Sequence, residues 1–244
     1  MMKPAFYSGA SGLVAFQESM NVIGNNIANC NTTGYKAQNT SFKQVLSTEM
    51  YANTENPSFA GNGVYAVTSG IDTSQGATIA SQGSLDLAIS GNGWFAVENN
   101  GHKEYTRDGA FSISLSGTSA NLVNSSGAFV LDSSGNRISA TIDAKTSAID
   151  VDSMINKVGV FTFANAQALT PTNSNCYLAN PTTGVAKVAA KSEYTVLTGR
   201  LEQSSVSLAD EMVNLISAQR AYQLSARVVQ TADEIEQTVN HLRG

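Results

Sequence analysis

The two ends of this 244-residue chain carry apolar residues spaced alternately three and four positions apart, and this pattern constrains the fold more than any other feature. Such spacing places the side chains on one face of an α-helix, as in the heptad seams through which helices pack together. We therefore predict a helix near the N-terminus. Besides Gly9, its seam consists of Phe6, Leu13, Phe16, Met20, Ile23 and Ile27.

The C-terminal seam is longer and predicts a helix over roughly 207–242. Ser207 followed by Asp210 has the spacing of a capping box, which marks a helix start. A second apolar flank makes the face wider than one partner helix would cover, which indicates further neighbours. The seam consists of Leu208, Met212, Leu215, Gln219, Tyr222, Ala226 and Val229, and it continues slightly out of phase with Ala232, Ile235, Val239 and Leu242. The flank consists of Val213, Ile216, Leu224 and Val228.

Between the two seams the apolar pattern changes to a period of two, in short runs separated by Gly, Asn, Ser and Asp. Alternation of this kind is typical of strands joined by turns. The predicted fold class is mainly β with α: a central all-β domain flanked by long terminal helices that form a coiled-coil-like layer on assembly. The predicted segments are an N-terminal helix with its amide-rich turn, a connecting segment that contains the loop ENPSFAGNG, the central β domain and a C-terminal helix, at 1–36, 37–63, 64–195 and 196–244.

Composition excludes several classes of partner. Charged residues make up 14% of the chain and the net charge is −5, without any cluster of basic residues, so we expect no nucleic-acid partner. No apolar run is long enough for a membrane helix, so we expect no membrane insertion. The N-terminal sequence does not have the pattern of a cleaved signal peptide.

Cys30 and Cys176 lack partners at metal-ligand spacing, and we expect no metal and no cofactor.

The terminal helices are not expected to be stable by themselves. Burial of one seam supplies less free energy than the backbone loses in entropy when the helix forms. We therefore predict that the ends become ordered when subunits assemble. The alternative is that both helices pack on the β domain of their own chain as ordinary core helices.

An amide-rich segment, NVIGNNIANCNTTGYK at 21–36, follows the N-terminal seam. Asn21, Asn25 and Asn29 recur every four residues, so they share one helix face, where their side chains can bond to neighbouring backbones. Gly34 allows the chain to turn. The simpler interpretation is a helix end capped by asparagines.

The same segment resembles the N-terminal signature of bacterial flagellar axial proteins, the rod and hook subunits. Two further stretches extend the resemblance over nearly the whole chain. QGSLDLAISGNGWFAV and YTRDGAFSI, within 82–113, resemble that family's central β domain, and GRLEQSSVSLADEMVNLISAQRAYQLSARVVQTADEI at 199–235 resembles its C-terminal helix. The chain departs from the family at Cys30, where a small apolar residue is usual, and at Ser205, where asparagine is usual.

The resemblance implies a non-enzymatic subunit of a hollow helical shaft in the flagellar basal body. It implies export, unfolded, through the flagellar type III apparatus, and contacts with identical subunits and with other rod and hook subunits. The small β region favours a rod subunit over a hook subunit. The seams and the amide-rich turn together predict a subunit interface made of Phe6, Leu13, Phe16, Met20, Ile23, Asn25, Asn26, Ile27, Asn29, Asn31, Gly34, Leu208, Met212, Leu215, Ile216, Tyr222, Val229, Ile235 and Val239.

Two other functions were weighed against this one. An enzyme would have to build its site around His102 or His241, and neither is flanked by a nucleophile or a set of metal ligands. A secreted glycan-binding β protein is the better rival, and its site would consist of Trp94, Phe95 and Tyr105 near polar turns. That function leaves the long terminal seams without a purpose.

Overall fold

The structure is a computed structural model that describes residues 3–46, 48–50, 58–116, 119–141 and 150–243. Its contacts divide the chain into two compact units, which we call the helical unit and the β unit. Both units are discontinuous in sequence. The helical unit consists of Met1–Ala28, Gln38–Ser69 and Ser207–Gly244, and the β unit of Asn29–Ala37 and Gly70–Val206.

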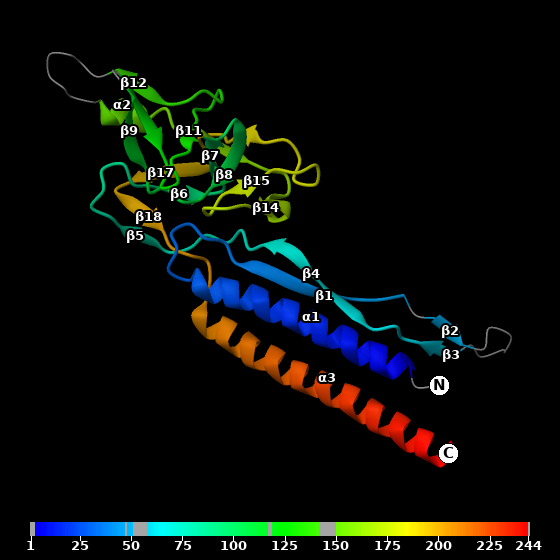
Figure 1. Cartoon of the computed structure of the whole chain (residues 1–244). Coiled ribbons are helices and arrows are strands. Elements are labelled where there is room, and N and C mark those ends of the chain that lie inside the picture. The colour runs from blue at the N-terminus through cyan, green and yellow to red at the C-terminus, as the bar shows by residue number, and fades with distance from the viewer. Residues whose placement is uncertain (1–2, 47, 51–57, 117–118, 142–149, 244) are drawn as a thin grey trace. The chain divides into compact units, whose positions relative to one another are not determined.

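Two long helices dominate the helical unit (Figure 1). They are α1 (Lys3–Ala28) and α3 (Leu208–Arg243), close to the predicted helices. The two helices run antiparallel: Asn26 of α1 bonds to Glu211 of α3, while Gly9 lies against Val229. The sequence therefore predicted both helices correctly, and they pack against each other within one chain.

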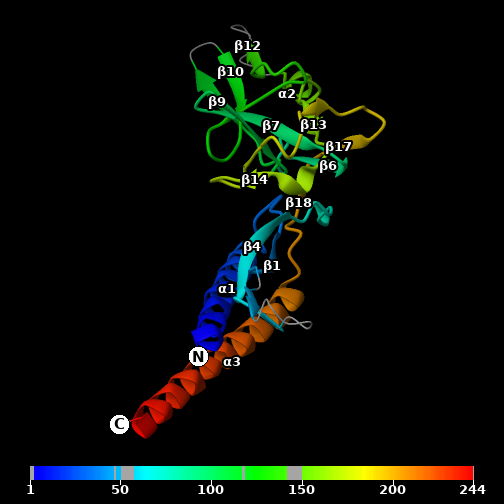
Figure 2. The same ribbon diagram turned by 90° about the vertical axis from the view of Figure 1, so that its right-hand side faces the viewer.

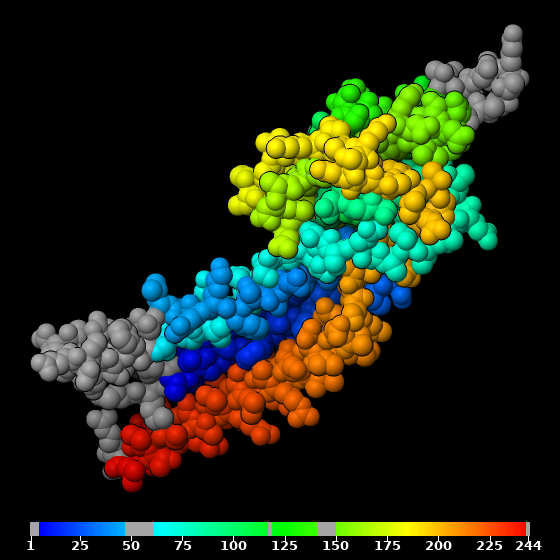
Figure 3. Space-filling view, turned by 180° about the vertical axis from the view of Figure 1, so that it is seen from behind, coloured from blue at the N-terminus to red at the C-terminus, as the bar shows by residue number. Residues whose placement is uncertain are grey.

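Short strands complete the helical unit. β1 (Gln38–Gln44) pairs with β4 (Val64–Ile71), and β2 (Thr48–Met50) pairs with β3 (Ser58–Ala60). Figure 3 shows α1 with α3 on one side and the β1 and β4 strands on the other. β1, β2 and β3 lie in the predicted connecting segment over 37–63, and β3 contradicts the loop predicted for ENPSFAGNG, although residues 47 and 51–57 lie outside the described residues. β1 reads QNTSFKQ, so no apolar alternation marked it as a strand.

β4 also lies differently from its predicted place. The sequence analysis assigned residues from 64 onward to the central domain, whereas β4 pairs with β1. Val64 N donates to Ser11 Oγ of α1 at 3.1 Å. Gly63, with a φ of +103°, makes the approach to Ser11 possible, because a Cβ there would overlap the Ser11 side chain.

The β unit contains one large, mostly antiparallel sheet with the path β12-β10-β11-β7-β8-β15-β14. β9 pairs with β10, β13 with β7, and β16 with β13, while β6–β17 and β5–β18 form separate ribbons. β6, β7, β8, β9, β11 and β13 overlap the alternating runs LDLAISG, GWFAVEN, EYTRDGAFSIS, AFVLDSSG and GVFTFAN, from which the sequence predicts strands. Their bounds are β5 Thr78–Ala80, β6 Leu87–Gly91, β7 Trp94–Asn99, β8 His102–Thr106, β9 Ser112–Ser116, β10 Ser119–Val123, β11 Phe129–Val130, β12 Ser139–Thr141, β13 Val160–Thr162, β14 Thr170–Pro171, β15 Tyr177–Leu178, β16 Lys187–Val188, β17 Tyr194–Thr198 and β18 Arg200–Glu202.

Strand β7 is buried on both faces and organises the core of the β unit. Because successive side chains of a strand point to opposite faces, its residues divide between two hydrophobic clusters. Phe95 and Val97 belong to a cluster with Leu87, and Trp94 and Ala96 to a second cluster. Two short helical turns, α2 (Val151–Ile155) and η1 (Ala166–Ala168), complete this unit.

Candidate functional site

The helix pair is lined on its inner side mainly by small residues. Gly12, Ala15 and Ser19 of α1 are buried, as are Ala218 and Ala232 of α3. Small side chains let the two helix axes approach closely. At Gly9 the packing is closest, because a Cβ there would lie 2.9 Å from Val229 Cγ2. Where Gly9 and Gly12 meet α3, close packing therefore leaves little room for large apolar side chains between the helices.

Many large apolar residues of α3 face outward instead. Val213 and Leu224 are 63% and 61% exposed. An ordinary core helix has the opposite arrangement, with its large apolar side chains inside. The wide apolar face predicted from the sequence is thus present and is left uncovered by α1. Its exposed members are Leu208, Met212, Val213, Ile216, Leu224, Val228, Ile235, Val239 and Leu242.

The predicted seam residues consequently fall into separate groups. Ile23 is buried, and another group is partly buried: Leu13, Phe16, Met20, Ile27, Leu215, Tyr222 and Val229. The exposed group consists of Phe6, Leu208, Met212, Ile216, Ile235 and Val239. The structure therefore brings Ile23 into the helical unit's interior and leaves the exposed group free for contacts outside the chain.

Asn26 is the amide that ties the helical unit together. It is 1% exposed, and its Nδ2 donates to Gln38 O at 2.9 Å and to Glu211 Oε1 at 3.0 Å. Its Oδ1 accepts from Gln38 N at 2.9 Å. One side chain thus bonds α1, β1 and α3. Asn26 lies outside the predicted stripe of Asn21, Asn25 and Asn29, on the buried face with Ser19 and Ile23.

The remaining residues of the amide-rich turn belong to the β unit. Asn29 Oδ1 accepts from Thr32 Oγ1 at 3.1 Å, and Asn31 is exposed. Gly34 has a φ of +64°, and a Cβ on it would lie 2.4 Å from Arg107 C and from Asp108 N. Gly34 is therefore packed against its own chain, at a position that only glycine fits.

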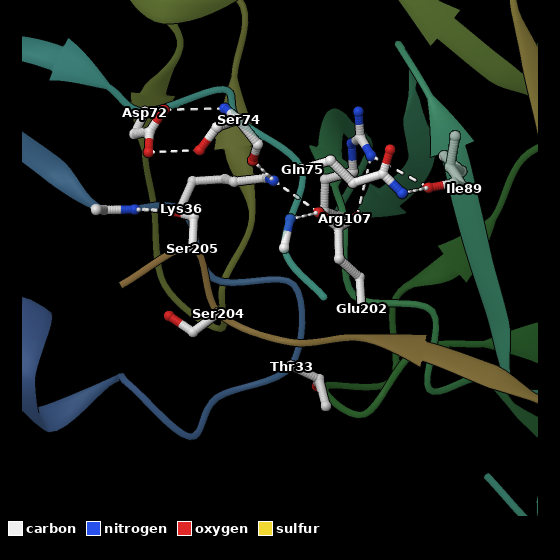
Figure 4. A network of polar contacts seen from close by, with 12 residues as sticks. Thr33, Lys36, Asp72, Ser74, Gln75, Ile89, Arg107, Glu202, Ser204 and Ser205 are labelled. Carbon is white, nitrogen blue, oxygen red and sulfur yellow. Dashed lines mark hydrogen bonds and ion pairs between the residues drawn. The ribbon is translucent and has the colours of Figure 1, made fainter. Parts of the chain in front are cut away.

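A buried cluster of three charged side chains lies beside this turn (Figure 4). Lys36 Nζ lies 2.7 Å from Glu202 Oε1, and Arg107 Nη1 lies 3.0 Å from Glu202 Oε2. The three side chains are between 0% and 3% exposed. Burial lowers the pKa of Lys36, and the adjacent Glu202 carboxylate acts in the opposite direction.

This ion cluster joins the three sequence motifs that carry the family resemblance. Lys36 ends NTTGYK, Arg107 lies in YTRDGAFSI, and Glu202 lies in GRLEQSSV. Backbone contacts reinforce it, since Gly34 N donates to Glu202 O at 2.8 Å. The sequence analysis missed these three residues. Their signal was the rarity of charge in the chain, together with the place of each charged residue inside a motif.

Ser205, which departs from the family pattern, also bonds to the turn. Its Oγ accepts from Ala37 N at 3.0 Å, and its own N donates to Tyr35 O at 3.0 Å. The hydroxyl thus satisfies a backbone donor at the point where the chain leaves the ion cluster. Serine provides the acceptor that this position needs.

The structure contradicts the proposed glycan site. Trp94, Phe95 and Tyr105 are all buried, with exposed fractions of 7% or less. Arg107 covers the Trp94 ring at 5.5 Å, and the Tyr177 ring packs on it at 5.2 Å. A sugar needs an exposed aromatic face on which to stack, so these residues cannot form such a platform.

The residues considered for an enzyme site have other surroundings. His102 and His241 are both exposed. Cys30 and Cys176 are free thiols, and burial raises the pKa of Cys176 to about 12. Within the described ranges, we find neither a group of three or more His, Cys, Asp or Glu side chains placed to hold a metal nor a helix long and apolar enough to cross a membrane.

Comparison with protein-family models gives three matches in chain order. Residues 6–36 match the model described as flagella basal body rod protein. Residues 88–162 match the flagellar hook protein FlgE/F/G D1 domain, and residues 197–242 match the flagellar basal body rod FlgEFG protein C-terminal. Each model contains one member of the ion cluster, at Lys36, Arg107 and Glu202.

Individual relatives resemble the chain over nearly its full length. Flagellar basal-body rod protein FlgG of Bacillus subtilis is 33% identical, with 99% of this chain and 100% of the relative covered. FlgG of Agrobacterium fabrum is 34% identical, covering 95% and 96%. The flagellar hook-basal body complex protein FlhP of Bacillus subtilis is 27% identical, covering 99% and 100%. The chain belongs to the family of flagellar basal-body rod proteins.

Proposed function

We propose that this chain is a structural, non-enzymatic subunit of the flagellar rod that polymerises through its terminal helices into a hollow shaft. Full-length similarity to FlgG proteins supports the rod rather than the hook. One structural observation supports the proposal that the subunits assemble with each other. The helix pair buries small residues and exposes large apolar ones, so its apolar surface is available to other subunits.

Polymerisation of identical subunits also fits the composition. Charged residues make up only 14% of the chain, and like charges would otherwise meet at every repeated contact. The helices would form a coiled-coil-like inner layer, with the β unit outside it. Such a shaft transmits torque and encloses the export channel.

Export unfolded through the flagellar type III apparatus is part of the same proposal. The helical unit is built from both ends of the chain and a central segment. It can therefore form only after the whole chain has been delivered. Assembly at the growing tip then provides the neighbours that cover the exposed face of α3.

A substitution on the exposed face of α3 tests the proposal. Leu224→Asp places a carboxylate where we expect a subunit contact, and burial of an unpaired carboxylate costs several kcal/mol in each subunit. We expect loss of polymers and of motility, with the thermal transition of the monomer unchanged because Leu224 is exposed there. Leu215 and Ile23 are less informative positions, because their side chains also lie inside the helical unit.

Gln223→Asp is the matched control. It adds the same charge at the neighbouring exposed position, where the side chain is polar rather than apolar. Normal polymers are expected from this variant. Normal polymers from Leu224→Asp would contradict the proposal that this face is a subunit contact.

A further inference from the structure

Helix α3 extends beyond the end of α1 in the helical unit. α1 has 26 residues and α3 has 36. The pair is aligned at one end by the bond between Asn26 and Glu211, and Gly9 lies opposite Val229 towards the other end. Continuing that alignment places Lys3 near Ile235. The excess length therefore lies at the C-terminal end of α3, as Figures 1 and 2 show, and we call residues 235–243 the overhang.

The overhang carries an exposed apolar face. Ile235, Val239 and Leu242 are spaced four and three residues apart, so they share one side of the helix. They are 45%, 48% and 83% exposed. This side continues the face of α3 on which Val229 and Ala232 pack towards α1. The face of α3 that packs on α1 thus continues beyond the end of α1.

A groove lies at the opposite end of the same unit. It has a volume of about 440 Å³ and is bounded by α1, β1 and α3. Its apolar lining consists mainly of Phe16, Ile23, Phe42 and Ala218, with the two phenylalanine rings 5.2 Å apart. Its one charged lining residue, Glu211, already accepts from Asn26.

The groove is long enough to hold the apolar face of the overhang. The groove follows α3 from Glu211 to Ala221, about 15 Å at 1.5 Å per residue, and the apolar face of the overhang spans about 11 Å. The three overhang residues that would enter are uncharged. Burial in the groove would remove this apolar surface from water, and Glu211, the one charged residue of the lining, would keep its hydrogen bond from Asn26.

We propose that the overhang of one subunit binds in this groove of the next subunit. A chain cannot fill its own groove, because Val239 and Ala218 lie about 30 Å apart along one continuous helix. The contact joins two different surfaces of identical chains, and such heterologous contacts generate open helical polymers. The inference rests on the proposed function and specifies which segment of a neighbour contacts which surface.

Cysteine cross-linking in the polymer tests the contact. Val239→Cys is combined with Asn214→Cys, which lies in the lining of the groove, in the full chain carrying Cys30→Ser. Purified basal bodies are treated with a short bis-maleimide and separated under denaturing conditions. Because every subunit carries both cysteines, we expect a ladder of dimers, trimers and longer products.

Two controls make the result specific. Val239→Cys paired with Val14→Cys, an exposed position of α1 outside the groove, should give no ladder. Val239→Cys alone should give no dimer. A ladder of equal strength from the Val14 pair, or dimers from Val239→Cys alone, would overturn the proposed docking.

The result separates this inference from the proposed function. If polymers form but the groove pair gives no ladder, the docking is wrong and self-assembly stands. If the chain forms no polymer at all, both are wrong.

Substitutions at the overhang give a second measurement that does not depend on cysteines. Val239→Asp should abolish polymers, whereas His241→Asp, on the opposite side of the helix from Val239, should leave them intact. Both positions are exposed, so the thermal transition of the monomer should not move. Equal polymer yields from the two variants would contradict the docking.

Discussion

Lys36 and Glu202 are 166 positions apart in the chain, and their side chains form an ion pair of 2.7 Å inside the β unit. Arg107 binds the other oxygen of the same carboxylate. One glutamate thus pairs with two buried basic side chains, which come from motifs far apart in the chain. Removal of this carboxylate would leave two buried like charges without their partner.

We expect Glu202→Gln to destabilise the β unit strongly. Breaking a buried ion pair by removing one partner costs about 3–5 kcal/mol. The free energy of unfolding, from denaturant titration of the purified chain, measures the loss. Glu98→Gln is the control, because its partner Arg137 is 53% exposed and the pair contributes little. Equal effects of the two substitutions would show that the ion cluster is not a stabilising element.

Gly34→Ala should also destabilise the β unit, through its backbone. The φ of +64° disfavours any residue with a Cβ, and the new atom would lie 2.4 Å from Arg107 C. We expect a lower Tm in a thermal scan. Gly127→Ala separates the two causes: Gly127 has a φ of +83° and open space around its Cβ position. If both variants lose the same stability, close packing of the turn contributes nothing.

The two cysteines should differ in reactivity. Burial raises the pKa of Cys176 to about 12, and the thiolate is the reactive form. At pH 8 in the folded protein, we expect a thiol reagent such as dithionitrobenzoate to react with Cys30, which is partly exposed, and to leave Cys176 unmodified. Unfolding in guanidinium should expose the second thiol. Reaction of both thiols at similar rates before unfolding would contradict the buried environment of Cys176.

Limited proteolysis tests whether the helical unit is ordered in the free monomer. We expect protease to cut within 5–28 and 207–240 before it cuts the β unit, because in the free chain the apolar face of α3 is exposed and would be covered only in the proposed polymer. The resistant core should include residues 70–206, identified by mass spectrometry of the fragments. Equal resistance of the terminal helices and the β unit would contradict ordering on assembly.

Local patterns in the sequence were sufficient for the two terminal helices and for several strands of the β unit, among them β6, β7, β8 and β13. Heptad spacing located α1 and α3, and two-residue alternation located β7 and β13. The heptad spacing and the two-residue alternation show directly which side chains share one face of a helix or strand. β1 was missed for the same reason, because its polar residues leave no apolar alternation to detect.

The sequence alone determined the helices, the wide apolar face of α3 and the family resemblance, because each depends on residues close together in the chain. The tertiary structure decided which part of each seam lies inside the helical unit, that Asn26 is the buried amide, and that Lys36, Arg107 and Glu202 converge. It also buried Trp94 and Tyr105, which had been assigned to a glycan surface. The physical reason is that helix rotation and long-range charge pairing depend on how distant segments pack, and local periodicity carries no information about that packing.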